Sequence, residues 1–210
     1  FLMSERIINH AKIALGKELS DSIYVTLPDH ISAAVNRYKE GIVLPNPLLW
    51  DIRQLYKDEF RVGLKAHVIV REDTGVEFTE DEAAFIALHF VNAQLGGEIR
   101  DIYDMTYLLK AVFGIVYDED GFRPDHESLN YYRFVTHLKF YARRIVSGEK
   151  YGDEDADLLE VVRFKYPRAY ACADRIRAYV QTEKGFHSGQ NELLYLTIHI
   201  ARVMEHPDEN

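Results

Sequence analysis

An internal repeat constrains this chain more than any other feature of its sequence. Four histidines fall into two matched pairs, because the step along the chain from His30 to His137 is nearly the same as the step from His89 to His199. The order of apolar and polar residues around each histidine recurs in the other half, in segments 24–30 and 131–137 and in segments 82–90 and 192–200. Two similar stretches in the same order and at nearly the same offset predict a tandem duplication of one domain.

Hydrophobic periodicity assigns both halves to the all-α class. Apolar residues recur three or four positions apart along most of the chain, which is the pattern of helices with one buried face. The Gly-Gly pair at 96–97 and the charged residues up to Asp104 interrupt this pattern. We therefore expect two homologous helical domains, residues 1–100 and 101–210.

Local signals predict where the helices of the first half begin and end. Pro28 lies inside an apolar stripe, so the helix there should either kink or begin just before it. Pro47 suits the first turn of a further helix, and residues 67–71 resemble a strand, although their length also permits a helix. Thr79 and Glu82 have the spacing of a capping box, in which the threonine caps the helix and the glutamate reaches back.

Similar signals organise the second half. Residues 124–144 are predicted to form one long helix. Apolar residues between Leu158 and Val180 recur like the seam of another long helix, which Pro167 should bend. Ser188 is placed to cap the last helix.

Charge and composition restrict the classes of function. The 210 residues carry a formal net charge of −9, so the chain should repel a phosphate backbone and should not bind RNA or DNA by itself. The only short basic cluster consists of Lys139, Arg143 and Arg144. The single cysteine, Cys172, permits no intrachain disulfide, and no apolar run is long enough for membrane insertion, so we expect a cytoplasmic protein. Because the sequence begins with Phe1, we expect it to be a piece of a longer protein that lacks an N-terminal domain.

The paired histidines have a structural explanation and several chemical ones. Inherited core packing after duplication would leave them as hydrogen-bonded structural residues. Metal binding needs spacings such as His-Glu-x-x-His, which the sequence lacks, so we expect no metal and no cofactor. Nucleophile elbows, P-loops and dinucleotide turns are also absent, so we predict no catalytic residue and no enzyme activity. The five unpaired histidines are expected to be ordinary surface or loop residues: His10, His67, His126, His187 and His206.

Phosphoryl transfer is the chemistry that best suits paired histidines. A neutral imidazole nitrogen is a good nucleophile near pH 7, because its unperturbed pKa is about 6.5. The candidate phosphoacceptors are His30, His89, His137 and His199. Asp29 is a candidate orienting acceptor for a neighbouring histidine, while Arg133 and Arg202 are candidate cations for an added phosphate. The first repeat has Asn92 at the position of Arg202, so the two domains should respond unequally to phosphorylation.

The histidine segments resemble the regulatory domains of the BglG/SacY/LicT family of bacterial transcription antiterminators. The resemblance runs over nearly the whole chain and rests on segments 19–31, 49–50, 55–60, 81–89, 131–140 and 192–200. It implies two tandem five-helix domains, called PRD1 and PRD2. The acceptor positions map onto His30 and His89 in the first domain and onto His137 and His199 in the second.

The same resemblance implies partners and a mechanism. A sugar-specific permease (EII) of the phosphotransferase system (PTS) would phosphorylate the first domain and switch the protein off. The phosphocarrier protein HPr would phosphorylate the second domain and switch it on. The output would be a rearranged homodimer, which lets an N-terminal RNA-binding domain, absent from this chain, hold an antiterminator hairpin. Two alternatives stay open: a DNA-binding transcription activator with the same repeats, and a helical dimerisation scaffold with structural histidines.

Overall fold

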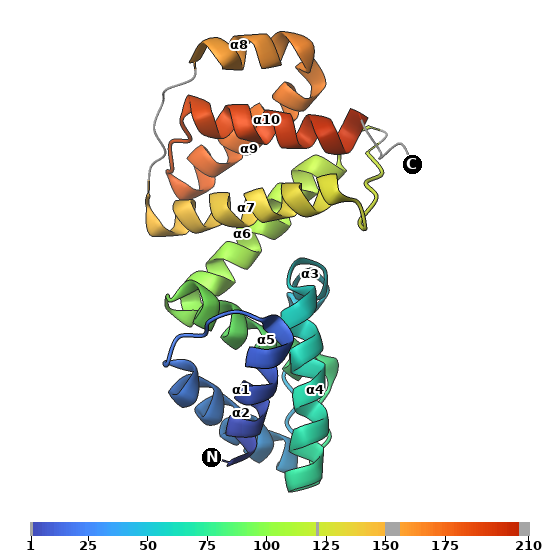
Figure 1. Cartoon of the computed structure of the whole chain (residues 1–210), viewed down its shortest axis with the longest axis vertical. Coiled ribbons are helices and arrows are strands. Elements are labelled where there is room, and N and C mark those ends of the chain that lie inside the picture. The colour runs from blue at the N-terminus through green and yellow to red at the C-terminus, as the bar shows by residue number, and fades with distance from the viewer. Residues whose placement is uncertain (1, 121, 150–155, 206–210) are drawn as a thin grey trace. The chain divides into compact units, whose positions relative to one another are not determined.

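The regular elements of the protein are α-helices wherever the structure describes the chain (Figure 1). The computed structural model describes residues 2–120, 122–149 and 156–205. The helices in these ranges are α1 (Leu2–Leu15), α2 (Ile23–Lys39), α3 (Leu49–Leu55), α4 (Lys57–Thr74), α5 (Glu80–Leu95), α6 (Ile99–Tyr117), α7 (Leu129–Ser147), α8 (Ala156–Lys165), α9 (Pro167–Lys184) and α10 (Gln190–Glu205). The all-α class predicted from periodicity is confirmed.

The chain forms two compact units that are built alike. The first covers Phe1–Thr106 and the second covers Tyr107–Asn210, with the division inside α6. In the first unit α5 packs against α4, α2 and α3, and in the second unit α10 packs in the same way against α9, α7 and α8. This correspondence follows the order of the sequence repeat, so each unit is one copy of the duplicated helical domain.

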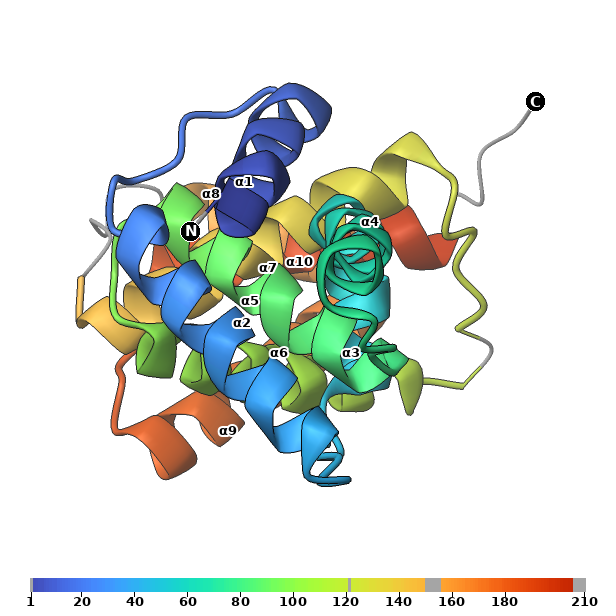
Figure 2. The same ribbon diagram turned by 90° about the horizontal axis from the view of Figure 1, so that it is seen from below.

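The core of the first unit is closed by a tight contact between α4 and α5. Its buried apolar residues come from α1, α2, α4 and α5, and they include Ile7, Ile31 and Phe90. A Cβ atom added to Gly63 on α4 would lie 2.3 Å from the carbonyl oxygen of Ala83 on α5. Glycine therefore sets how closely these two helices approach. Figure 2 shows α2 running beside α5 in the same unit.

The structure decides three points that the sequence left open or placed differently in the first unit. α2 includes Pro28 and begins well before it, at Ile23, so the proline does not mark the start of the helix. Pro47 precedes α3, which begins at Leu49. Residues 67–71 belong to α4, which ends at Thr74 with Gly75 as its C-cap, so the helical alternative holds for them.

The second unit also departs from the predicted helix limits. α7 begins at Leu129 rather than at 124, because Ser128 caps it and accepts a hydrogen bond from the Tyr131 N–H at 3.1 Å. The predicted long helix through Pro167 is two helices, α8 and α9. Proline starts α9 at its first turn, where its missing N–H costs nothing. Ser188 pairs with the Tyr141 hydroxyl at 2.5 Å and is buried.

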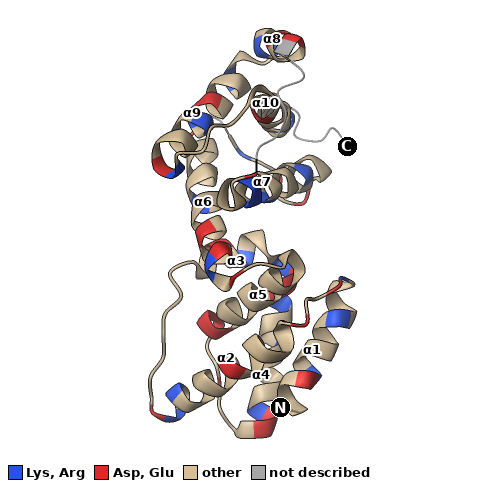
Figure 3. Ribbon diagram, turned by 90° about the vertical axis from the view of Figure 1, so that its left-hand side faces the viewer, with Lys and Arg blue, Asp and Glu red and all other residues tan. Residues whose placement is uncertain are grey.

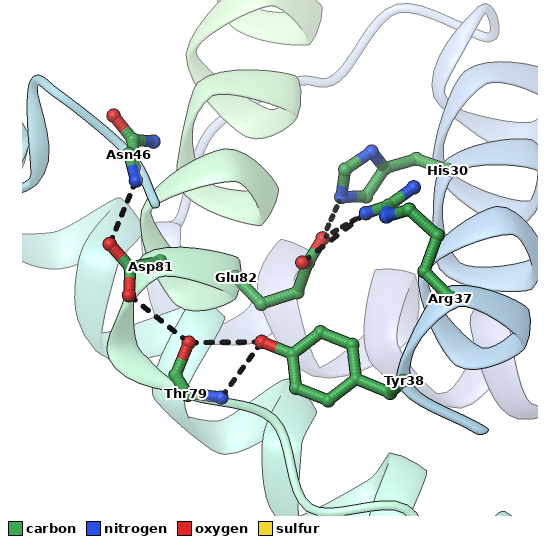
Figure 4. Close-up of polar contacts among 7 residues, drawn as sticks. All are labelled: His30, Arg37, Tyr38, Asn46, Thr79, Asp81 and Glu82. Carbon is green, nitrogen blue, oxygen red and sulfur yellow. Dashed lines mark hydrogen bonds and ion pairs between the residues drawn. The ribbon is translucent and has the colours of Figure 1, made fainter. Parts of the chain in front are cut away.

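The capping box predicted at the start of α5 does not form. Thr79 occupies the N-cap position in extended conformation, but its side chain makes no capping hydrogen bond. Its hydroxyl lies 2.9 Å from the Tyr38 hydroxyl and donates to Asp81 at 3.2 Å (Figure 4). The carboxylate of Glu82 therefore does not reach back to the helix start, and it points toward α2 instead.

The distribution of charge on the described helices is mixed. Figure 3 shows acidic and basic residues on helices of both units, with basic residues on α7. No helix in the described ranges combines the length and the apolar character needed to cross a membrane.

Candidate functional site

The first unit brings His30 and His89 together. His30 comes from α2 and His89 from α5, and the centroids of their imidazole rings are 4.7 Å apart with the planes tilted by 45°. The ring of Phe85, one turn before His89 on α5, lies 6.1 Å from the His30 ring. Both histidines are half-buried, so the pair sits at the rim of the α2–α5 contact rather than in the centre of the core.

A buried carboxylate contacts one histidine of this first pair. Glu82 is fully buried, and its Oε1 lies 2.6 Å from Nε2 of His30 (Figure 4). The angle of this contact is poorer than that of a regular hydrogen bond, so its attraction is chiefly electrostatic. Arg37, two turns after His30 on α2, reaches the same carboxylate at 3.4 and 3.5 Å. Glu82 is thus shared between an imidazole and a guanidinium.

The second unit repeats the pair with different surroundings. His137 on α7 and His199 on α10 have ring centroids 4.7 Å apart, and their planes are stacked at 27°. Tyr195 lies 6.0 Å from the His137 ring, in the position that Phe85 occupies in the first unit. The duplicated sequence therefore places a close histidine pair at the same point of both helical domains.

The buried carboxylate of the second unit is held by arginine alone. The Nε and Nη2 of Arg144 donate to the two oxygens of Glu192 at 2.6 and 2.9 Å, which is a bidentate pair. The Nε2 of His137 is buried and has no hydrogen-bond partner. The same carboxylate–arginine combination is present in both units, but the imidazole contacts the carboxylate only in the first.

Burial lowers the pKa of three of the paired histidines, His89, His137 and His199. Burial lowers the pKa of His89 to about 3, with a further contribution from His30. Burial likewise lowers the pKa of His137 to about 3, and His199 and Arg144 add to the effect. The pKa of His199 is lowered by burial first and then by Arg202 and Arg133. A neutral imidazole retains a lone pair on one ring nitrogen, so it can act as a nucleophile.

The predicted supporting residues differ in how they relate to the pairs. Asp29 is exposed on α2, and the carboxylate against His30 is that of Glu82. Arg133 and Arg202 both act electrostatically on His199, which places two cations near the second pair. The residue corresponding to Arg202 in the first unit, Asn92, is buried and its Oδ1 has no partner.

Sequence reasoning did not identify Arg37 and Arg144 as site residues. The step along the chain from Arg37 to Arg144 equals the step from His30 to His137, so the repeat itself carried the signal. Glu82 was recognised, but only as a helix cap. Its true environment depends on α2 facing α5, which the spacing of residues within one helix does not reveal.

The unpaired histidines include one that is not a surface residue. His67 lies half-buried on α4 with its ring edge against Phe78, and its Nε2 is buried without a partner, so the surface prediction was wrong for it. His206 lies outside the described residues. Cys172 is buried, and burial raises the pKa of its thiol to about 12, so it is unreactive at neutral pH. Within the described ranges, His, Cys, Asp and Glu side chains do not gather into a group of three that suits a metal ion.

The fold and the two histidine pairs define a duplicated helical domain that carries one buried carboxylate–arginine pair and one histidine pair in each copy. The family model of the PRD domain matches residues 5–93 and residues 119–203. The chain belongs to the PRD family, in the branch of BglG/LicT transcription antiterminators.

Relatives support this membership over most of the chain. The chain is 48% identical over 203 residues to the transcription antiterminator LicT of Bacillus subtilis, covering 97% of this chain and 73% of the relative. It is 38% identical over 200 residues to the beta-glucoside operon antiterminator of Dickeya chrysanthemi, covering 95% and 71%. It is 30% identical over 186 residues to protein GlcT of Staphylococcus aureus, covering 89% and 65%.

Proposed function

We propose that this chain is the regulatory region of a transcription antiterminator controlled by histidine phosphorylation. The phosphoacceptors are His30, His89, His137 and His199, and the donors belong to the sugar phosphotransferase system. Phosphorylation changes the association of two copies of the chain, and this controls RNA binding by a separate N-terminal domain. Two of the relatives are antiterminators by name, which supports this output.

The observation that carries the proposal is the close pair of partly buried imidazoles in each repeat. A phosphoryl group carries close to two negative charges near pH 7. Ring centroids only 4.7 Å apart bring the charge of a phosphoryl group on one ring close to the other ring and its helix. We expect this added charge to change how the two helices pack. A helix pair that changes its packing is a physical link between a covalent mark and a change in subunit association.

The charges around the two pairs support opposite responses. A phosphate on His30 would add negative charge to a ring whose Nε2 already contacts the buried carboxylate of Glu82, which disfavours it. A phosphate on His199 would lie near Arg133 and Arg202, which attract it. We therefore assign the inactivating phosphorylation to the first unit and the activating phosphorylation to the second. The family resemblance assigns the permease as donor to the first unit and HPr to the second.

Mapping of phosphorylation sites tests the proposal. The chain is incubated separately with phosphorylated HPr and with the phosphorylated permease component, and acid-labile label is located by mass spectrometry. We expect label on His137 and His199 with HPr and on His30 and His89 with the permease. Replacement of each pair by alanine should abolish the corresponding label. Absence of label at all four positions would favour the scaffold with structural histidines.

A further inference from the structure

The buried glutamate of the first unit joins α5 to α2, but its arginine partner on α2 reaches it only at long distance. Glu82 is 0% exposed and does not cap α5, and its carboxylate is directed at α2. Burying a carboxylate is costly unless it is paired and hydrogen-bonded. Arg37 alone compensates it poorly, because the nearest guanidinium nitrogen lies 3.4 Å away. The shortest contact of the carboxylate is with the imidazole of His30, at 2.6 Å.

That short contact determines where the imidazole proton lies. Two lone pairs at 2.6 Å would repel each other, so a proton must lie on Nε2 of His30 when it faces the carboxylate. A neutral imidazole carries one proton, so a neutral His30 ring with its proton on Nε2 holds the free lone pair on Nδ1. Nε2 is also the buried nitrogen of this ring, which makes Nδ1 the nitrogen left for a donor.

The second unit provides a natural comparison. There Arg144 donates to both oxygens of Glu192. Neither the Nε2 of His30 nor that of His137 makes a regular hydrogen bond within the described residues, but a carboxylate oxygen lies 2.6 Å from the first. No carboxylate fixes the proton on the His137 ring. The two units thus differ in one respect that matters for chemistry: the buried glutamate contacts the acceptor histidine in the first unit and not in the second.

We propose that Glu82 is a positioning residue for phosphoryl transfer, which holds the proton on Nε2 of His30 and directs the phosphoryl group to Nδ1. This inference rests on the proposed function. In the step, the Nδ1 lone pair forms the new N–P bond while the N–P bond of a phosphohistidine on the donor protein breaks. The electron pair of the broken bond returns to the donor ring. The Nε2 proton stays in place, and the carboxylate balances the positive charge that develops on the His30 ring.

The test combines the position of the phosphoryl group with the rate of labelling. The chain is labelled with ¹⁵N-histidine and phosphorylated by the permease component, and long-range ¹H–¹⁵N NMR distinguishes Nδ1-phosphohistidine from Nε2-phosphohistidine. We expect only the Nδ1 isomer at His30. In Glu82→Gln we expect both isomers and labelling of His30 slower by about tenfold, the loss typical of removing a group that orients a functional histidine. A purely structural glutamate would not change the isomer.

Glu192→Gln is the matched control. It removes the corresponding carboxylate of the second unit, and it should leave the rate and the isomer at His30 unchanged. Circular dichroism verifies that each variant is folded, and the isomer formed by the unaltered chain tests the idea even if Glu82→Gln does not fold. Nε2-phosphohistidine at His30, or unchanged labelling in a folded Glu82→Gln, would overturn this inference alone. An unlabelled His30 in the unaltered chain would overturn the proposed function and this inference with it.

Discussion

His89 and His137 are uncharged rings in the folded protein, because burial lowers the pKa of each to about 3. The pKa of an unfolded histidine is about 6.5. Between these values the unfolded chain binds more protons than the folded chain. The free energy of unfolding is therefore unaffected by these two groups above pH 6.5. It falls as the pH drops from 6.5 toward 3.

This linkage predicts that the protein loses stability in mild acid. The free energy of unfolding, measured with urea, should be lower at pH 5 than at pH 7. In His89→Gln the difference between the two pH values should become smaller, because one group with a lowered pKa is removed. A pH dependence that is identical in the variant would show that His89 is not held neutral by burial.

The two buried glutamates predict unequal costs for removing their arginines. Arg144→Met leaves Glu192 without its bidentate partner, so the free energy of unfolding should fall by roughly 3 kcal/mol, as for other broken buried pairs. Arg37→Met should cost less, about 1 kcal/mol, because Glu82 keeps its contact with His30. Urea denaturation of both variants measures the difference. Equal losses would contradict the different pairing of the two carboxylates.

At the level of helices, the contact between α4 and α5 is limited by one residue. Gly63→Ala would place a Cβ atom 2.3 Å from the carbonyl oxygen of Ala83, and backbone cannot move aside cheaply. We expect a loss of about 1–3 kcal/mol, the usual cost of overpacking. Chemical denaturation followed by circular dichroism measures it.

Gly114→Ala is the control for this prediction. Gly114 is exposed within α6, and a Cβ atom there meets nothing within 4 Å. This substitution should raise stability by about 0.5–1 kcal/mol, because alanine is the better helix former. If Gly63→Ala raised stability as Gly114→Ala does, helix propensity would outweigh the α4–α5 contact, and this would contradict the prediction.

Helix periodicity predicted the class and the repeated histidine segments predicted the duplication, but neither predicted where individual helices end. The seam of apolar residues between Leu158 and Val180 continues across two helices, since α8 and α9 are separated only at Tyr166 and the apolar spacing does not change there. Proline at 167 was interpreted as a bend, whereas its fixed backbone angle also suits the first turn of a new helix. Composition does not separate these two uses of proline.

The histidines of the site were found because they repeat, and their partners were missed because they are tertiary contacts. Glu82 and Glu192 each precede a histidine by two helical turns, but the capping box explained Glu82 by a local rule, and this interpretation was wrong. The contact with His30 joins α5 to α2, two helices that α3 and α4 separate along the chain. Local patterns describe neighbours along one helix, so a carboxylate directed at another helix is visible only once the fold is known.

For the molecule as a whole, the acidic balance predicts that RNA recognition requires another domain. The net charge of −9 opposes binding to a phosphate backbone. In a filter-binding assay at low salt, this chain should retain neither an antiterminator hairpin nor a control RNA above background. Sequence-selective retention of the hairpin by this chain would contradict the prediction that RNA recognition requires another domain.

The central claim is that phosphates on the paired histidines change how strongly two copies of the chain associate. Sedimentation equilibrium of the chain before and after site-verified phosphorylation by HPr or by the permease component tests it most directly. The account predicts a stronger dimer with phosphate on His137 and His199, a weaker one with phosphate on His30 and His89, and no response in the corresponding alanine variants. An unchanged association constant in all phosphorylated forms would contradict it.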